Sequence, residues 1–370
     1  MGTWPRSRRA RVRRRLAEAR RLVDVGAIAL REHAPLVRVC AAAMLTALAL
    51  GAATAAERPF KAPRTADGQP DLQGYWTNNT VVPLQRPAAY ADRAQLTEAE
   101  ARERLDKALE PSETEAGTDA DVHYQLTDYG LDITQRKMNI DTRTAAIVDP
   151  ADGKLPAPRP EAAAKAKERA DYTRAHAYDS AQMLGLSVRC IVWPHQGPPI
   201  MPTGYNSNLE IYQSPGYVTI ITEMMPDARI VPLDGRPHLP GGVKQWLGDS
   251  RGHWDGNTLV IETTNYTGRT QVPGTPAGLL LTPDARVTEY LERTGADTLR
   301  YRFTVEDKNL WDRSWTAEYP LVRIDGMRFE YACQEGNYGL ANTLSGARAK
   351  EREAAAQGTT PRDPVPPPRR

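Results

Sequence analysis

The stretch from residue 223 to residue 265 holds the densest group of side chains in the chain that are suited to chemistry. A histidine that titrates near neutrality can carry a proton, a carboxylate can orient its ring, and a guanidinium can bind an oxyanion. If the protein is an enzyme, we therefore expect cofactor-free acid–base chemistry such as hydrolysis, elimination or isomerisation. His253 is the expected proton shuttle and Asp249 the group that orients it. Arg251 or Arg229 is expected to stabilise the anion.

The alternative interpretation of the same residues is structural. Charged side chains of both signs alternate through this stretch, and such residues can form a salt-bridge network that holds long loops on a fold. The sequence leaves both interpretations open.

Two tryptophans of this stretch, Trp246 and Trp254, stand among charged residues and not within an apolar run. An aromatic floor with a charged rim is typical of a small-molecule pocket, although aromatic residues of a β domain also serve as core. The expected substrate-binding residues are Trp246, Trp254, Glu223, Arg236, His238, Glu262 and Tyr338.

Other chemistries have weaker support. The candidate metal ligands are His195, His238 and His253 with Asp234 or Asp249, but no histidine pair at helical spacing and no Cys-x-x-Cys accompanies them, so no metal is predicted. Gly248-Asp-Ser-Arg-Gly252 resembles Gly-x-Ser-x-Gly only superficially, because the surrounding sequence is rich in strands and lacks a following helix. Phosphate loops and dinucleotide fingerprints are absent from the sequence, so no cofactor is expected.

Short strands separated by turns must position these residues. In residues 299–305 apolar and polar side chains alternate completely, which predicts a half-buried strand. Asp255-Gly256 and Asp325-Gly326 predict hairpin turns. The expected strands are 142–148, 209–213, 217–224, 258–266, 286–293, 299–305 and 327–333, with a short strand start at 71–77.

These strands predict a mainly β fold, an antiparallel meander that closes into a lipocalin-like barrel or packs as a sandwich to hide its edges. Peripheral helices are expected at 97–109, where Thr97 and Glu100 form a capping box, at 160–172, and at 346–357. Residues 57–358 are expected to form a single β-rich domain, followed by a disordered proline-rich tail at 359–370.

The N-terminus predicts export. Eleven arginines within residues 1–56 precede or flank an apolar run and the small residues Ala53 to Ala56, which together are typical of a signal peptide cleaved near Ala55 or Ala56. The apolar run is shorter than the roughly 20 residues of a membrane span, so no stable membrane insertion is expected after cleavage. A single N-terminal anchor is the alternative. We expect a periplasmic or secreted protein.

Charge and cysteine content agree with this location. Beyond residue 56 the chain keeps 37 Lys and Arg against 43 Asp and Glu, a net charge of about −6, and without a basic stripe no nucleic-acid partner is expected. Cys40 falls in the leader. The two remaining cysteines, Cys190 and Cys333, are predicted to form a disulfide in an oxidising compartment, with Cys333 pointing toward the core.

Four stretches carry a family resemblance: Glu223–His238, Trp246–Trp254, Leu259–Thr263 and Tyr331–Tyr338. In these motifs the chain resembles a widespread family of exported bacterial β-rich proteins to which no reaction is assigned, and the resemblance extends from about Asp71 to Arg348. It implies export and the extent of the domain, but it transfers no catalytic residue. The family pattern has histidine where this chain has Pro226.

Taken together, the sequence predicts an exported β-barrel-like protein that binds a small organic molecule in a cavity lined by residues 223–265 and 330–338. The alternative is a non-catalytic carrier or a component that interacts with other proteins of the cell envelope. A deep pocket with converging His, Asp and Arg side chains would favour the enzyme. A filled barrel with an exposed apolar patch would favour the partner-binding protein.

Overall fold

The computed structural model describes residues 60–109, 137–203, 206–225, 227–326, 328 and 330–359. The expected signal peptide lies outside the described residues, and so does the expected tail apart from Thr359. Lys61–Arg370 forms a compact unit of its own, and the described strands and helices all belong to it.

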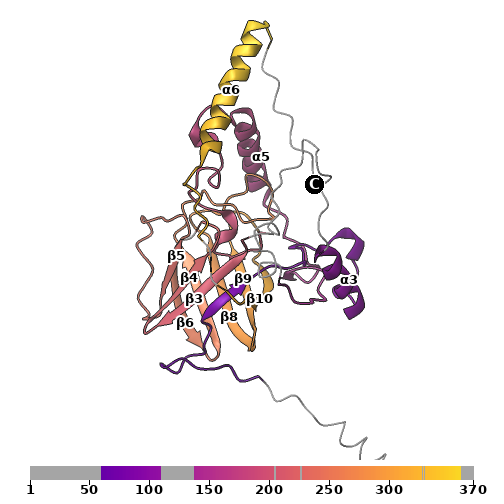
Figure 1. Ribbon diagram of the computed structural model, residues 1–370, viewed down its shortest axis with the longest axis vertical. Coiled ribbons are helices and arrows are strands. Elements are labelled where there is room, and N and C mark those ends of the chain that lie inside the picture. Colours follow the sequence, from indigo (N-terminus) through magenta and orange to yellow (C-terminus); the bar gives the residue numbers. More distant parts are fainter. Residues whose placement is uncertain are drawn as a thin grey trace, which may run out of the picture. The chain divides into compact units, whose positions relative to one another are not determined.

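A ten-stranded antiparallel sheet dominates the described residues (Figure 1). Its strands follow the order β5-β4-β3-β1-β10-β9-β8-β7-β6, and β2 pairs with β10 beside this path. The strands are β1 (Gly74–Thr77), β2 (Ile147–Asp149), β3 (Asn208–Ser214), β4 (Tyr217–Thr222), β5 (Ala228–Pro232), β6 (Asp249–Asp255), β7 (Thr258–Thr264), β8 (Arg286–Gly295), β9 (Thr298–Glu306) and β10 (Trp315–Arg323).

The two end strands of this path, β5 and β6, lie against each other, so the sheet is nearly closed into a barrel. Gly252 on β6 shows how close they come. A Cβ atom at this position would lie 2.7 Å from Leu233 Cδ2 and 2.9 Å from Val231 Cγ1, so any larger residue would require these side chains to shift. The prediction of a mainly β, antiparallel fold is confirmed, and of the two closures considered the structure has the barrel.

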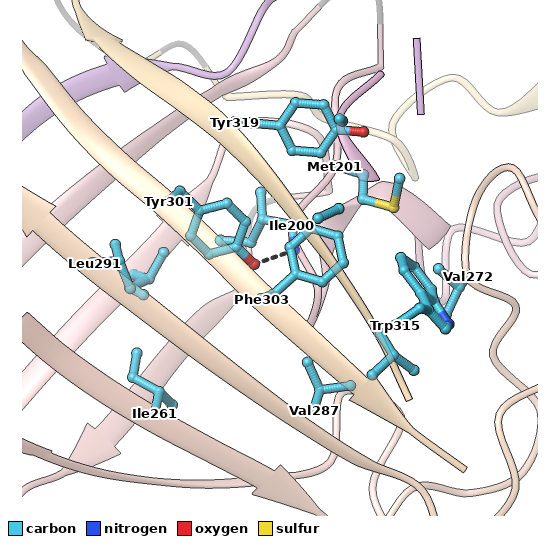
Figure 2. Close-up of a cluster of buried hydrophobic side chains, with 14 of the residues drawn as sticks. Ile200, Met201, Ile261, Val272, Val287, Leu291, Tyr301, Phe303, Trp315 and Tyr319 are labelled. Carbon is cyan, nitrogen blue, oxygen red and sulfur yellow. Dashed lines mark hydrogen bonds between the residues drawn. The ribbon is translucent and has the colours of Figure 1, made fainter. Parts of the chain in front are cut away.

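The alternation along β9 is the one the sequence predicts, with Leu299, Tyr301, Phe303 and Val305 buried. Together with side chains of β7, β8 and β10 they fill the barrel interior (Figure 2). Phe303 packs edge-on against Trp315 at a ring-centroid distance of 5.7 Å. The interior is therefore a packed core.

A segment from outside the sheet also contributes to this core. Residues 196–201 are buried, and the backbone N–H of Ile200 donates to the hydroxyl of Tyr301 over 2.8 Å (Figure 2). The hydroxyl of Tyr266 donates to the carbonyl of Pro198 over 3.4 Å. We call residues 196–201 the plug segment, because they occupy space among the inward-facing side chains of the barrel.

The strand expected at 327–333 is wrong: of its described residues, Arg328 and 330–333, none is in a strand. The sequence analysis did not predict β10, which carries Pro320 in its middle. β10 is paired with β9 on one side and with β1 and β2 on the other, so no edge remains for a following hairpin partner. Asp325-Gly326 accordingly leaves the sheet, whereas Asp255-Gly256 does form the predicted turn between β6 and β7.

The other expected strands agree with the observed strands to different degrees. Those at 209–213, 217–224, 258–266, 286–293 and 299–305 correspond to β3, β4, β7, β8 and β9. The strand expected at 142–148 overlaps β2 only at its end, and neither β5 nor β6 was among the expected strands.

Three helices of four or more residues lie in the described residues: α3 (Glu98–Leu109), α5 (Pro160–Ala175) and α6 (Tyr338–Ala356). The capping box of α3 is present, with the N–H of Thr97 donating to Glu100 over 2.8 Å. Helix α5 buries Ala162 and Ala166. Helix α6 begins eight residues earlier than expected.

The disulfide between Cys190 and Cys333 is present, as predicted. Its setting differs from the expectation, because both cysteines are partly exposed and neither is in a strand. The bond joins the chain just before the plug segment to the chain just before α6. The side chain of Asn337 supports the junction by donating to the carbonyl of Val188 over 3.1 Å.

Candidate functional site

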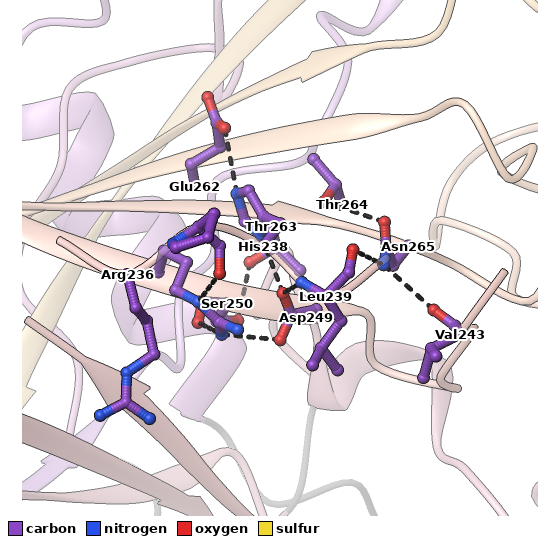
Figure 3. Close-up of polar contacts among 12 residues, drawn as sticks. Arg236, His238, Leu239, Val243, Asp249, Ser250, Glu262, Thr263, Thr264 and Asn265 are labelled. Atoms are coloured by element: carbon purple, nitrogen blue, oxygen red, sulfur yellow. Dashed lines mark hydrogen bonds and ion pairs between the residues drawn. The ribbon is translucent and has the colours of Figure 1, made fainter. Parts of the chain in front are cut away.

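His238 and Asp249 lie at the centre of a charged network on β6, β7 and β8 (Figure 3). The two ring nitrogens of His238 face carboxylates, Nδ1 lying 2.9 Å from Asp249 and Nε2 lying 3.1 Å from Glu262. Arg251 donates to the other oxygen of Asp249 over 2.6 Å, and Arg286 pairs with Glu262. We call these five residues the His238 network.

The network fastens the loop between β5 and β6. The N–H of Leu239 donates to Asp249 over 2.9 Å, and the amide of Asn265 donates to the carbonyls of Leu239 and Val243 over 2.9 and 3.0 Å (Figure 3). Charged hydrogen bonds of this kind stabilise by about 1.5–3 kcal/mol each when they are shielded from water. The arrangement is that of the structural alternative weighed from the sequence.

Asp249 orients His238 and not His253. The two residues His253 and Asp249 are four positions apart on β6, which is roughly 13 Å along a strand. The side chain of His253 is exposed and makes no hydrogen bond with the described residues. The expected catalytic pair is therefore separated by the extended geometry of the strand.

The side chain of Arg229 is also paired with a residue that the sequence analysis did not consider. It pairs with Glu289 inside the barrel, one N–H donating over 3.0 Å, and Glu289 is completely buried. The hydroxyl of Tyr301 donates to the same carboxylate over 2.7 Å, and burial raises the pKa of Tyr301 well above its usual value. The guanidinium of Arg229 thus has an internal carboxylate partner that the sequence did not predict. Glu289 was not singled out from the sequence.

The remaining expected binding residues are scattered. Arg236 is exposed and pairs with Asp234. Trp254 packs against the core, and Trp246 is half-buried. Tyr338 is 74% exposed at the start of α6. The described residues therefore do not bring these side chains together in one cavity.

Glu223 is the expected binding residue that does lie beside a recess. Its carboxylate is fully buried and accepts hydrogen bonds from the hydroxyl of Tyr75 over 2.7 Å and from the amides of Asn206 and Asn208 over 2.8 and 2.7 Å. Burial, together with the hydrogen bond to Glu223, raises the pKa of Tyr75. Glu223 thus holds two asparagines in fixed orientations.

The recess opens at the end of the barrel where β1 ends, β3 begins and β4 ends, since Thr77 pairs with Asn208 and Leu209 pairs with Thr222. It is lined by Asn78, by residues of 193–203, by residues 206–209, and by Thr222 and Met224. Its free volume is about 10 Å³, which is room for about one water molecule or one compact chemical group. We call it the polar recess.

Five polar atoms of the recess lining are buried and have no hydrogen-bond partner among the described residues. They are Asn78 Oδ1, Trp193 Nε1, His195 Nδ1, Asn208 Oδ1 and Thr222 Oγ1. Each buried polar atom left in this condition costs about 1–3 kcal/mol, and native proteins carry few of them. Their convergence on one recess is the strongest sign of a binding site in the described residues.

His195 is neutral in this setting. Burial lowers its pKa from the usual 6.5 to about 4, so the ring carries no charge at physiological pH. Sequence reasoning considered His195 only as a metal ligand.

The backbone around the recess is strained. Asn206 and Met225 have φ angles of +48° and +50°, a left-handed conformation that costs a residue such as methionine roughly 1 kcal/mol or more. The amide of Gln196 donates to the carbonyl of Met225 over 2.7 Å and holds it there. Strain of this kind concentrates at functional sites.

Neither a metal site nor a membrane-spanning helix is found in the described part of the chain. It contains no group of three or more His, Cys, Asp or Glu side chains placed to hold a metal ion. Its helices include none with the length and apolar character needed to cross a bilayer.

No protein-family model matches the chain, and no curated protein matches it in sequence.

Proposed function

We propose that this protein is exported and binds a small molecule through the polar recess at the end of its barrel. The observation that carries the proposal is the set of five buried polar atoms that converge there and lack a partner in the part of the chain that the structure describes. A ligand that supplies hydrogen bonds to them recovers free energy that the ligand-free protein leaves unused. The small free volume indicates that one compact group of the ligand enters and the rest lies outside.

Export is supported by two features. The N-terminal sequence has the basic, apolar and small-residue order of a signal peptide. The Cys190–Cys333 disulfide is a bond that persists in oxidising compartments. The location we propose is periplasmic or secreted.

The geometry favours binding over acid–base catalysis at His253. A proton shuttle needs a partner that orients its ring, and the carboxylate expected for this task belongs to the His238 network. The packed interior of the barrel likewise supports a ligand site at the rim and not in the centre.

The proposal is tested with one substitution and a matched control. Thr222→Val removes a buried hydroxyl that pairs with no described residue, whereas Thr263→Val removes a buried hydroxyl that hydrogen-bonds Ser250 over 2.8 Å. Both proteins are purified natively from the cell envelope. Native mass spectrometry records any bound small molecule, and urea unfolding records stability.

We expect the two variants to separate binding from stability. Thr222→Val should lose the bound molecule and keep an unfolding free energy equal to or above that of the wild type. Thr263→Val should keep the molecule and lose about 1–2 kcal/mol of stability, because Ser250 loses its partner. A wild-type protein that carries no small molecule, or a Thr222→Val variant that retains it, would overturn the proposal.

A further inference from the structure

The hydrogen-bonding character of the polar recess is set by Glu223. The carboxylate of Glu223 can only accept, so Asn208 must turn its NH₂ group toward it, and the observed Nδ2 to Oε2 distance is 2.7 Å. This leaves Asn208 Oδ1 on the recess side as a fixed acceptor to which no described residue donates. The amide of Asn206 is turned the same way, over 2.8 Å.

The other unpartnered atoms add mostly acceptors. Asn78 presents its Oδ1, and the hydroxyl of Thr222 and the Nδ1 of the neutral His195 are both able to accept. The one obligatory donor among the five is the indole N–H of Trp193. The recess therefore offers more acceptors than donors.

The charge of the recess lining also favours a ligand group that donates hydrogen bonds. Among the described residues that line the recess there is no arginine and no lysine, so none of them pairs with an anionic group. The oxygens of a carboxylate or phosphate would instead face Asn208 Oδ1, with the carboxylate of Glu223 directly behind it. Contacts between acceptors leave desolvated polar groups without partners, which is unfavourable in a buried site.

We infer that the polar recess binds a compact N–H donor group, either a carboxamide or a protonated amine, and rejects carboxylates and phosphates. The acceptors take the N–H groups of the ligand. In a carboxamide, the oxygen accepts from the indole N–H of Trp193. This inference rests on the proposed function and specifies the class of ligand for that same site.

The test uses three small probes of similar size: propionamide, n-propylammonium and propionate. Binding to the ¹⁵N-labelled protein is followed through the indole N–H resonance of Trp193, which is assigned by its loss in Trp193→Phe. We expect propionamide or n-propylammonium to bind at least tenfold more tightly than propionate. The tighter of the two shows whether the natural ligand group is neutral or cationic.

A variant pair tests the role of Glu223. Glu223→Gln can donate as well as accept, so Asn208 is no longer held in one orientation, and the preference over propionate should fall to less than threefold. Glu262→Gln makes the same chemical change in the His238 network and should keep the full preference. Circular dichroism and thermal unfolding establish that both variants are folded.

Propionate binding as tightly as the two donors would overturn the inference, and so would a Trp193 resonance that none of the three probes shifts. Neither result touches the proposed function, which is judged by the small molecule retained in native mass spectrometry. If Glu223→Gln is unfolded, Asn208→Leu removes the fixed acceptor directly and should abolish the preference. A preference that survives this change would also overturn the inference.

Discussion

The His238 network and the polar recess are both polar clusters on the same barrel, and they differ in how completely their groups are paired. In the network each carboxylate is bonded to a cationic side chain, and both nitrogens of His238 are engaged. In the recess five buried atoms have no partner within the described residues. The network lies on the strands and fastens a loop, whereas the recess lies at the end of the barrel beside strained backbone.

This difference separates stability from binding. A network whose members already pair with one another gains no hydrogen bonds from a ligand. Breaking such a network leaves charged groups without partners. A recess with unsatisfied atoms costs stability in the free protein and recovers it on binding. Of the residues that the sequence suggested for chemistry, four belong to the first kind of cluster: His238, Asp249, Arg251 and Glu262.

The largest effect is expected from breaking the network at its centre. Asp249→Ala removes the acceptor shared by His238, Arg251 and the N–H of Leu239, so we expect a loss of about 3 kcal/mol in the free energy of unfolding. Urea denaturation monitored by fluorescence measures it. The small molecule should still be retained, since the network is not part of the recess. A stability within about 0.5 kcal/mol of the wild type, a range that is typical of surface changes, would show that the network does not anchor the loop.

A smaller effect is expected from the pH response of His195. Its folded pKa of about 4 lies below the usual 6.5, so the unfolded chain takes up a proton first as the pH falls. The contribution to stability is complete above pH 6.5 and is lost as the pH falls from 6.5 toward 4. After allowance for partial solvent screening, we expect this contribution of His195 to the free energy of unfolding to be about 2 kcal/mol.

Unfolding free energies at pH 7 and pH 4.5 check this response. In His195→Gln the difference between the two pH values should shrink by this contribution. His176→Gln changes an exposed histidine that pairs with Asp179, and it should keep the wild-type difference. Equal pH responses of His195→Gln and the wild type would contradict the burial of His195.

The smallest effect is expected at His253. His253→Ala changes an exposed side chain that has no hydrogen bond with the described residues, so stability should change by less than about 0.5 kcal/mol, and the bound molecule should be retained. Unfolding and native mass spectrometry measure the two quantities. Loss of the molecule from a folded His253→Ala protein would move the site to β6 and restore the acid–base hypothesis.

Local patterns explain what could be predicted. Alternation in β9, the capping box of α3 and the Asp255-Gly256 turn depend on neighbouring residues, and all three are present. β10 escaped prediction because Pro320 interrupts its pattern. The strand tolerates this residue where its partner on one side changes from β2 to β1.

The sequence by itself determined the mainly β class, most of the strands, and the pairing of Cys190 with Cys333. These follow from side-chain period, turn chemistry and the count of cysteines. Only the tertiary structure decided which polar residues are satisfied. Trp193 and Thr222 are unremarkable in the sequence, and they line one recess because the chain that leads into the plug segment meets the end of β4 there. Whether a buried polar atom has a partner depends on residues distant in the chain, and no local pattern records it.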